Sequence, residues 1–209
     1  MKTTDTTVGE FLQRLAGGTA TPGGGSVVAL SGALSAALCA MVGRLTTGRA
    51  RYQEVWSEME QMQNRADKLA VKLLDLVDKD IEAYNRVMAA MKMPIETEEQ
   101  RSYRREAIQE ATRQAALVPM ETLRVLAELT GLIERAVSKG NPNCLTDAGV
   151  AALLIQAAAL GAAYNVRVNL SGIDDKDFVK SVKSELEEVL KGILFPVEGL
   201  NKLVDHRLG

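Results

Sequence analysis

The sequence predicts an all-α protein, a helical bundle with long helices and two central helices of small residues. Three observations favour this fold class. No stretch of useful length alternates apolar and polar residues as a half-buried strand does. An apolar seam recurs at alternating steps of three and four residues from Val55 to Leu76. Two uncharged runs rich in Ala, Ser and Gly, at 26–43 and 148–166, are long enough to form buried helices.

The first element is a short amphipathic helix that a glycine loop follows. Thr6 or Thr7 is its candidate N-cap, and Gly17 and Gly18 end its pattern. Farther on, Pro22 and three glycines lead into the first small-residue helix, for which we expect Ser26 to be the N-cap.

The glycine loop is a candidate binding site because it opens a helix. Glycine accepts backbone angles closed to other residues, and the helix N-terminus offers free N–H groups and a positive dipole end. Such a junction can bind an anion or an electron-rich ligand atom. Taken alone, the glycines fit a tight turn better, since no strand precedes them and no Gly-Lys-Ser/Thr follows.

The uncharged run from Thr21 to Gly43 is also long enough to span a bilayer. A spanning helix is rich in Leu, Ile and Phe, whereas this run is mostly Ala, Gly and Ser. Its small residues form two low ridges that a second helix can approach closely. We therefore expect a helix within a soluble bundle or at a subunit contact, and no membrane partner.

A long helix is predicted from about Gly48 to Met93, where Pro94 stops it. The seam position after Leu76 is Asp80, an acid where the period requires an apolar residue. A buried carboxylate needs a partner, a water-lined cavity or a raised pKa. The alternative is that the helix curves and Asp80 pairs with an Arg at its edge. We favour a functional role, because local rules tend to fail at sites.

The next helix begins at a capping box of Thr97 and Gln100 and carries Tyr103 on its inward face. Pro119 lies inside its pattern. Because proline has no N–H, the carbonyl of Ala115 loses its helical donor, and another group must satisfy it.

The second small-residue helix follows a turn at Gly140–Asn143, and Asn143 or Thr146 is its expected N-cap. Asn165 and Asn169 are four residues apart and share a face of this helix, where buried amides need partners. A final amphipathic helix runs from Asp174, with a break near Pro196. We expect the two small-residue helices to pack together at the centre of the bundle.

Composition narrows the chemistry. The 209 residues are read as a single domain, 1–209, and a net charge of −2 gives no support for nucleic-acid binding. The polar N-terminus lacks a signal peptide, so a cytoplasmic location is expected. The two cysteines form no CxxC pair and have no histidine nearby, so neither a zinc site nor a redox pair is expected. The single histidine, His206, lies three residues from the end of the sequence, where we expect a solvated side chain. Carboxylates, amides, hydroxyls, Lys or Arg must do the chemistry.

Six motifs give the chain a resemblance that runs through its whole length. They are PGGGS at Pro22–Ser26, LTTGR at Leu45–Arg49, DKDIEAYNRVMAAMKMP at Asp78–Pro94, ALVP ending at Pro119, GNPNCLTDAGVAA at Gly140–Ala152 and NVRVNL at Asn165–Leu170. In their order and spacing the chain resembles the cyclodeaminase domain of formiminotransferase-cyclodeaminase and its stand-alone relatives, which include methenyltetrahydrofolate cyclohydrolases.

The resemblance implies an all-helical homodimer that acts on 5,10-methenyltetrahydrofolate or its 5-formimino precursor, with no metal and no cofactor beyond tetrahydrofolate. It implies Asp80 and Asp147 as the acid or base, the asparagines at the pterin edge and Arg49 at the glutamate tail. The substrate-binding residues it implies are Gly23, Gly24, Gly25, Ser26, Arg49, Asn141, Asn165 and Asn169.

Two reactions fit this family, and a non-enzyme is the third alternative. A cyclohydrolase adds water to the methenyl carbon, and a cyclodeaminase expels ammonia as N10 attacks the formimino carbon. The chain contains no formiminotransferase module, which favours the cyclohydrolase. A helical assembly module that binds folate without turnover would leave Asp80, the triple glycine and the paired asparagines without a purpose.

Overall fold

The computed structural model describes residues 2–209, apart from the side chain of Thr4, and within that range it contains helices and no strand. The all-α prediction is therefore confirmed. The helices are α1 (Val8–Ala16), α2 (Gly24–Thr46), α3 (Trp56–Met91), α4 (Glu98–Lys139), α5 (Leu145–Leu170) and α6 (Lys176–Leu208), and three 3-10 turns lie at Thr3–Asp5, Ala50–Val55 and Pro142–Cys144.

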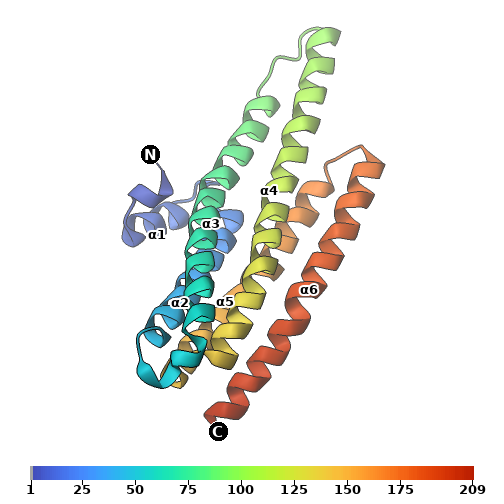
Figure 1. The fold of residues 1–209 in the computed structure, drawn as a ribbon. Coiled ribbons are helices and arrows are strands. Elements are labelled where there is room, and N and C mark those ends of the chain that lie inside the picture. Colours follow the sequence, from blue (N-terminus) through green and yellow to red (C-terminus); the bar gives the residue numbers. More distant parts are fainter. Residues whose placement is uncertain (1) are drawn as a thin grey trace.

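Helices α2 to α5 form the bundle, and α6 packs along α4 and α5 (Figure 1). The two small-residue helices pack directly against each other, as predicted. They run antiparallel: the Ser35 hydroxyl of α2 donates to the Ala151 carbonyl of α5 at 2.8 Å, while the Asn141 N–H, just before α5, donates to Thr46 Oγ1 at the end of α2. This packing places the start of α2 beside the end of α5.

Two of the four predicted caps are confirmed. Thr7 and Thr97 each form a capping box, with Glu10 and Gln100. The cap expected at Ser26 is wrong, because α2 begins at Gly24 and its N-cap residue is Gly23. Neither expected residue caps α5, whose N-cap position is occupied by Cys144. Both small-residue helices, α2 and α5, therefore begin without a side-chain hydrogen bond from their N-cap residue.

The seam of α3 forms much of the core. Its residues from Met59 to Leu76 are buried, and Val55, just before α3, is half-buried. The long helix predicted from Gly48 instead begins at Trp56, after a 3-10 turn. Helix α6 passes Pro196 without the predicted break.

The adjoining ends of α3 and α4 extend beyond the other helices (Figure 1). Within the described residues no third helix covers these ends, so Tyr103 is 67% exposed although its period predicted an inward position. The core-facing part of α4 starts near Ala115.

Two segments, Gly24–Thr46 and Pro142–Leu170, have the length and hydropathy of membrane spans. In the bundle, 61% of the most apolar window of the first and 44% of that of the second are buried. Packing in the core accounts for most of the apolar character of α2, whereas α5 keeps much apolar surface outside it.

Candidate active site

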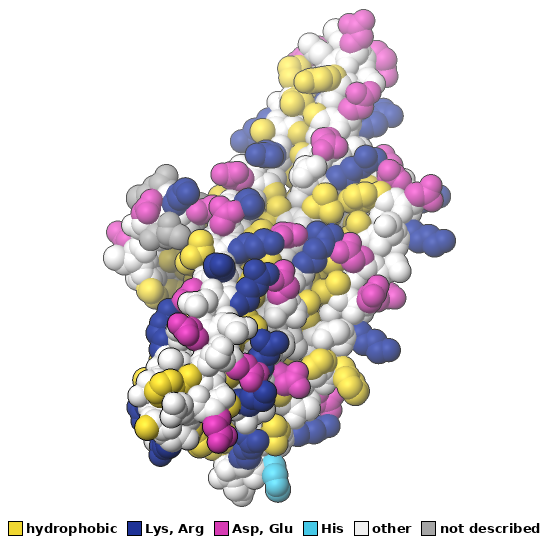
Figure 2. Space-filling model, in the orientation of Figure 1, with side chains coloured by type: hydrophobic (Ala, Val, Ile, Leu, Met, Phe, Trp, Pro, Cys, Tyr) yellow, Lys and Arg dark blue, Asp and Glu magenta, His cyan; other side chains and the backbone are white. Residues whose placement is uncertain are grey.

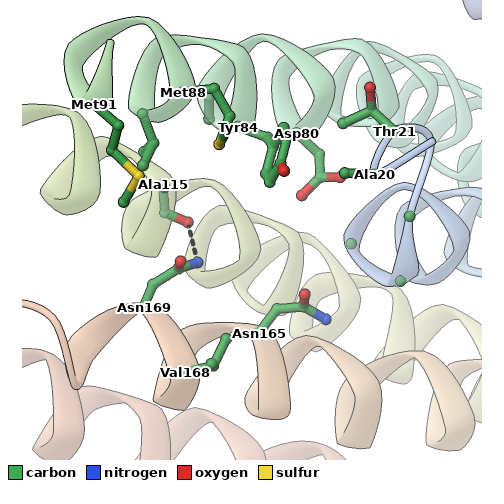
Figure 3. A pocket seen from close by; sticks show the side chains of 15 residues that line it. Ala20, Thr21, Asp80, Tyr84, Met88, Met91, Ala115, Asn165, Val168 and Asn169 are labelled. Atoms are coloured by element: carbon green, nitrogen blue, oxygen red, sulfur yellow. Dashed lines mark hydrogen bonds between the residues drawn. The ribbon is translucent and has the colours of Figure 1, made fainter. Parts of the chain in front are cut away.

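A cavity of about 320 Å³ lies where the glycine loop, α3, α4 and α5 meet (Figure 3). This volume is at the lower end of the usual range for ligand pockets, about 300–1,000 Å³. The loop contributes Ala20, Thr21 and the three glycines, α3 contributes Asp80 and the face beyond it, and α5 contributes Asn165 and Asn169. Six residues that the sequence predicted as site residues therefore line one cavity: Gly23, Gly24, Gly25, Asp80, Asn165 and Asn169.

Asp80 is held against the first turn of α2. The fully buried Ser26 donates from its hydroxyl to Asp80 Oδ2 at 2.8 Å. Burial raises the pKa of the Asp80 carboxyl above its ordinary value, and hydrogen bonds from the Ser26 side chain and backbone N–H partly oppose that rise. The Asp80 carboxylate thus takes the place of a side-chain cap at the first turn of α2. The alternative expectation, that Asp80 pairs with an Arg, is wrong, because its partner is Ser26.

Gly25 is required by the closeness of this contact. A Cβ built on Gly25 would lie 2.0 Å from Asp80 Oδ1 and 2.5 Å from Cγ, far inside van der Waals contact. The backbone angles are not the reason: the non-terminal glycines with positive φ are Gly18 and Gly48, outside this loop. Glycine at position 25 therefore allows the Asp80 carboxylate to approach the backbone at the start of α2 closely.

The two asparagines lie on one side of the cavity, one turn apart on α5 (Figure 3). Asn165 Nδ2 donates to the Gly161 carbonyl at 2.8 Å, and Asn169 Nδ2 donates to the Ala115 carbonyl at 2.8 Å. The second bond satisfies the carbonyl that Pro119 leaves without a helical donor, as the sequence requires. Both amides are thereby oriented with their nitrogen toward the protein backbone.

Three large cavity residues on α3 were not singled out from the sequence. Tyr84, Met88 and Met91 follow Asp80 along the same face and line the cavity beyond it (Figure 3). Their signal was present, because steps of three and four residues from Asp80 reach each of them. The thioether and phenol groups give this side of the cavity large, mostly apolar side chains.

Three predicted site residues lie at the opposite end of the α2–α5 pair. Ala151 is level with Ser35, about 15 Å along α2 from Gly25 at 1.5 Å per residue, and Asp147 is one turn farther still. Within this chain, Asp147 therefore does not meet the glycine loop. Arg49 lies near it, since both charges act on the Cys144 thiol, whose pKa is raised mainly by burial.

Asn141 joins the ends of two helices. Its side-chain Nδ2 donates to the Leu45 carbonyl at 3.2 Å, and its Oδ1 accepts from Tyr52 Oη at 2.9 Å. The residue is 2% exposed. With these bonds Asn141 ties the entry of α5 to the end of α2, away from the cavity.

Among the residues that the structure describes, Asp80 is the only charged one that lines the cavity. An ionised carboxylate on an otherwise uncharged wall attracts a cationic group and can accept a proton from it or from water. In the described part of the chain, no group of three or more His, Cys, Asp or Glu side chains is placed to hold a metal ion.

Known proteins are similar to this chain in sequence and in fold. A sequence model described as formiminotransferase-cyclodeaminase matches residues 7–188. The chain is 39% identical over 198 residues to a methenyltetrahydrofolate cyclohydrolase of Methylorubrum extorquens, covering 95% of this chain and 93% of that protein.

Two further relatives carry the other activity in their names. A formimidoyltransferase-cyclodeaminase of Rattus norvegicus is 33% identical over 187 residues, which cover 90% of this chain but only 35% of the rat protein. The crystal structure of a formiminotetrahydrofolate cyclodeaminase from Thermotoga maritima superposes with a TM-score of 0.89, at 32% identity and 99% coverage of both chains.

Proposed function

Since this chain belongs to the formiminotransferase-cyclodeaminase family, we propose that it is a tetrahydrofolate one-carbon enzyme, a methenyltetrahydrofolate cyclohydrolase. The observation that carries this proposal is the Asp80 carboxylate, held by Ser26 at the start of α2 and facing the cavity. The 39% identity to the Methylorubrum cyclohydrolase over nearly the whole of both chains supports this reaction.

The substrate and the cavity have complementary charge. The 5,10-methenyl bridge is a cation whose charge is shared by N5 and N10. Asp80 presents the opposite charge on a wall made otherwise of uncharged residues. In such a partly desolvated site the attraction is stronger than in water, which favours the methenyl cation over the neutral product.

Asp80 also has the chemistry that water addition needs. As water attacks the methenyl carbon, the carboxylate accepts a proton from it, and a neutral tetrahedral carbon forms between N5 and N10. Asp80 then returns the proton to N5 as the carbon–N5 bond breaks, while the hydroxyl proton leaves to solvent. The products are 10-formyltetrahydrofolate and one released proton. A raised pKa brings the carboxyl closer to the range in which both transfers are efficient.

The cyclodeaminase reaction is the second candidate, favoured by the similarity to the Thermotoga protein over 99% of both chains. There N10 attacks the formimino carbon, and the N10 proton passes to the imino nitrogen. The acid form of Asp80 then gives this nitrogen a second proton, and its bond to the carbon breaks to release ammonia and leave the methenyl cation. Both reactions pass through a tetrahedral carbon between two nitrogens, so the same carboxylate serves either.

Two assays on the purified protein decide between these activities. With 5,10-methenyltetrahydrofolate we expect the methenyl absorbance to decay faster than in buffer, as 10-formyltetrahydrofolate forms. With 5-formiminotetrahydrofolate we expect little ammonia. Ammonia release with slow methenyl decay would assign the cyclodeaminase instead, and folate binding without either reaction would assign a binding module.

We further propose that the enzyme is a cytoplasmic homodimer in which α2 and α5 form the subunit contact. Large apolar residues form a stripe on the outer side of this helix pair: Leu34 on α2 and Val150, Leu153, Leu160 and Tyr164 on α5 are all more than a third exposed. Neither uncharged run, 26–43 or 148–166, carries a repelling charge. In contrast, basic and acidic side chains mix over the face of α3, α4 and α6 seen in Figure 2. A second copy of the same stripe is an uncharged partner that fits it.

Light scattering tests the dimer. The wild type is expected to have twice the mass of the 22.5 kDa chain, and L153E is expected to shift it to monomer, because two charges would be buried in a two-fold contact. Val71, 69% exposed on α3, provides the control: V71E should remain dimeric. A monomeric wild type would rule out this contact.

A further inference from the structure

Pro119 lies one turn from the cavity, and its effect reaches the cavity through a backbone carbonyl. In an unbroken helix the N–H of residue 119 would donate to the carbonyl of Ala115. Proline has no N–H, so that carbonyl is left for another donor. Asn169 Nδ2 donates to it at 2.8 Å (Figure 3). Pro119 and Ala115 are both buried, and Asn169 is the side chain that satisfies this carbonyl beside the cavity.

This hydrogen bond decides which atom Asn169 offers to a ligand. A side-chain amide can turn over and exchange its oxygen and nitrogen. Turned over, Asn169 would place Oδ1 against the Ala115 carbonyl, two acceptors facing each other. The free carbonyl therefore fixes the nitrogen toward α4 and leaves Oδ1 as the group available to the cavity. Asn165 is oriented in the same way by the Gly161 carbonyl.

We propose that Pro119 is a positioning residue for folate binding: by freeing the Ala115 carbonyl, it holds Asn169 as a hydrogen-bond acceptor for an N–H group of the bound pterin. This inference rests on the proposed function, which supplies the folate. The two asparagine oxygens, one turn apart, then form an acceptor pair. Such a pair selects a ring edge with adjacent donors, such as the pterin N3–H and 2-amino group, over an edge that carries acceptors.

Substitution of Pro119 by alanine restores a helical donor for the Ala115 carbonyl and changes no residue that lines the cavity. In P119A the new N–H can donate to the Ala115 carbonyl and compete with Asn169. We expect the KM for the folate substrate, and its dissociation constant, to rise about five- to tenfold, the effect of one hydrogen bond. The kcat should stay within about twofold, because Asp80 is untouched. The melting temperature should change little, because the better helix propensity of alanine offsets the loss of the buried proline ring atoms.

The other proline inside a helix is the matched control. Pro196 of α6 is outside the cavity wall, and P196A makes the same chemical change in a helix. It should leave KM and the dissociation constant at the wild-type values. An equal rise in P119A and P196A would show a general effect of helix straightening and would overturn the proposal.

A double-mutant cycle separates positioning from a merely structural role. N169A removes the acceptor, so it should raise KM by itself, and adding P119A to it should raise KM no further. If the two effects multiply instead, Pro119 acts independently of Asn169 and the proposal is wrong. Should N169A fold poorly, N169D allows the same test through the melting temperature. The carboxylate of N169D cannot donate to the Ala115 carbonyl, so this variant should melt lower than wild type. Adding P119A should raise that melting temperature, because its new N–H can donate to the carbonyl.

A ligand-free measurement keeps this test distinct from that of the proposed function. In the nuclear magnetic resonance spectrum, the Asn169 side-chain N–H groups should exchange with solvent slowly in wild type and faster in P119A. Unchanged exchange overturns the coupling between Pro119 and Asn169 even if the enzyme is a cyclohydrolase. Faster exchange together with no folate binding by wild type would instead refute the proposed function, and the role in binding with it.

Discussion

Replacement of Asp80 by asparagine is expected to lower kcat about 10²–10⁴-fold, the usual contribution of a general acid or base. Asparagine keeps the shape of the side chain and can accept a hydrogen bond from the Ser26 hydroxyl, but it cannot carry a proton between water and N5. Initial rates of methenyl absorbance decay measure the effect. Folate binding should survive better than turnover, because the cavity keeps its walls.

Fold stability provides the check that D80N acts on chemistry. Burial raises the pKa of Asp80, so the folded chain binds the proton more tightly than the unfolded chain does. The stabilisation from this proton is present at low pH and is lost as pH rises through the folded pKa. At neutral pH the ionised carboxylate therefore costs stability, and D80N should melt no lower than wild type. D75N, which alters an exposed acid paired with Lys79 on the same helix, should keep full activity.

Substitution of Gly25 by alanine is expected to lower kcat about 100-fold, because a misplacement of about 1 Å at a catalytic group has this cost. The new methyl carbon would lie only 2.0 Å from Asp80 Oδ1, so the carboxylate must move and break its hydrogen bond with Ser26. Steady-state rates and the melting temperature measure the two consequences. Both should fall, since the hydrogen bond between Ser26 and Asp80 is lost with the displacement.

The effect of G25A should run through Asp80. In the D80N background, G25A is therefore expected to lower kcat by little more, because the group that it displaces no longer transfers protons. G131A, at a helical glycine where a new Cβ would meet no atom within 4 Å apart from its own stretch of helix backbone, controls for alanine in a helix and should retain wild-type rates. A G25A enzyme with full activity would show that the close contact has no catalytic purpose.

Periodicity predicted the parts of the site that lie on single helices. Asp80 interrupts the seam of α3, and Asn165 and Asn169 share a face of α5, so each could be selected from spacing alone. The same spacing reaches Tyr84. Pro119 identified a carbonyl in need of a donor, because the chemistry of proline does not depend on the fold. These predictions use only local geometry, which the sequence determines.

Contacts between helices could not be predicted in this way. Ser26 has the residue type of an N-cap, and only the approach of α3 shows that it binds Asp80 instead. Asp147 sits in a motif as distinctive as that of Asp80, yet the antiparallel packing of α2 and α5 sets it at the other end of the pair. Tyr103 obeys the helical period, but α4 extends past the helices that would cover it.

The most direct measurement of the role of Asp80 is the dependence of kcat/KM for 5,10-methenyltetrahydrofolate on pH, in wild type and D80N. A carboxylate that accepts a proton from water must be ionised, so wild-type activity should fall on acidification. The midpoint should lie above the ordinary range of an aspartate, because burial raises the pKa of Asp80. In D80N the residual activity should show no such fall. An acidic limb with the same midpoint in both proteins would show that another group carries the proton, and would contradict the mechanism.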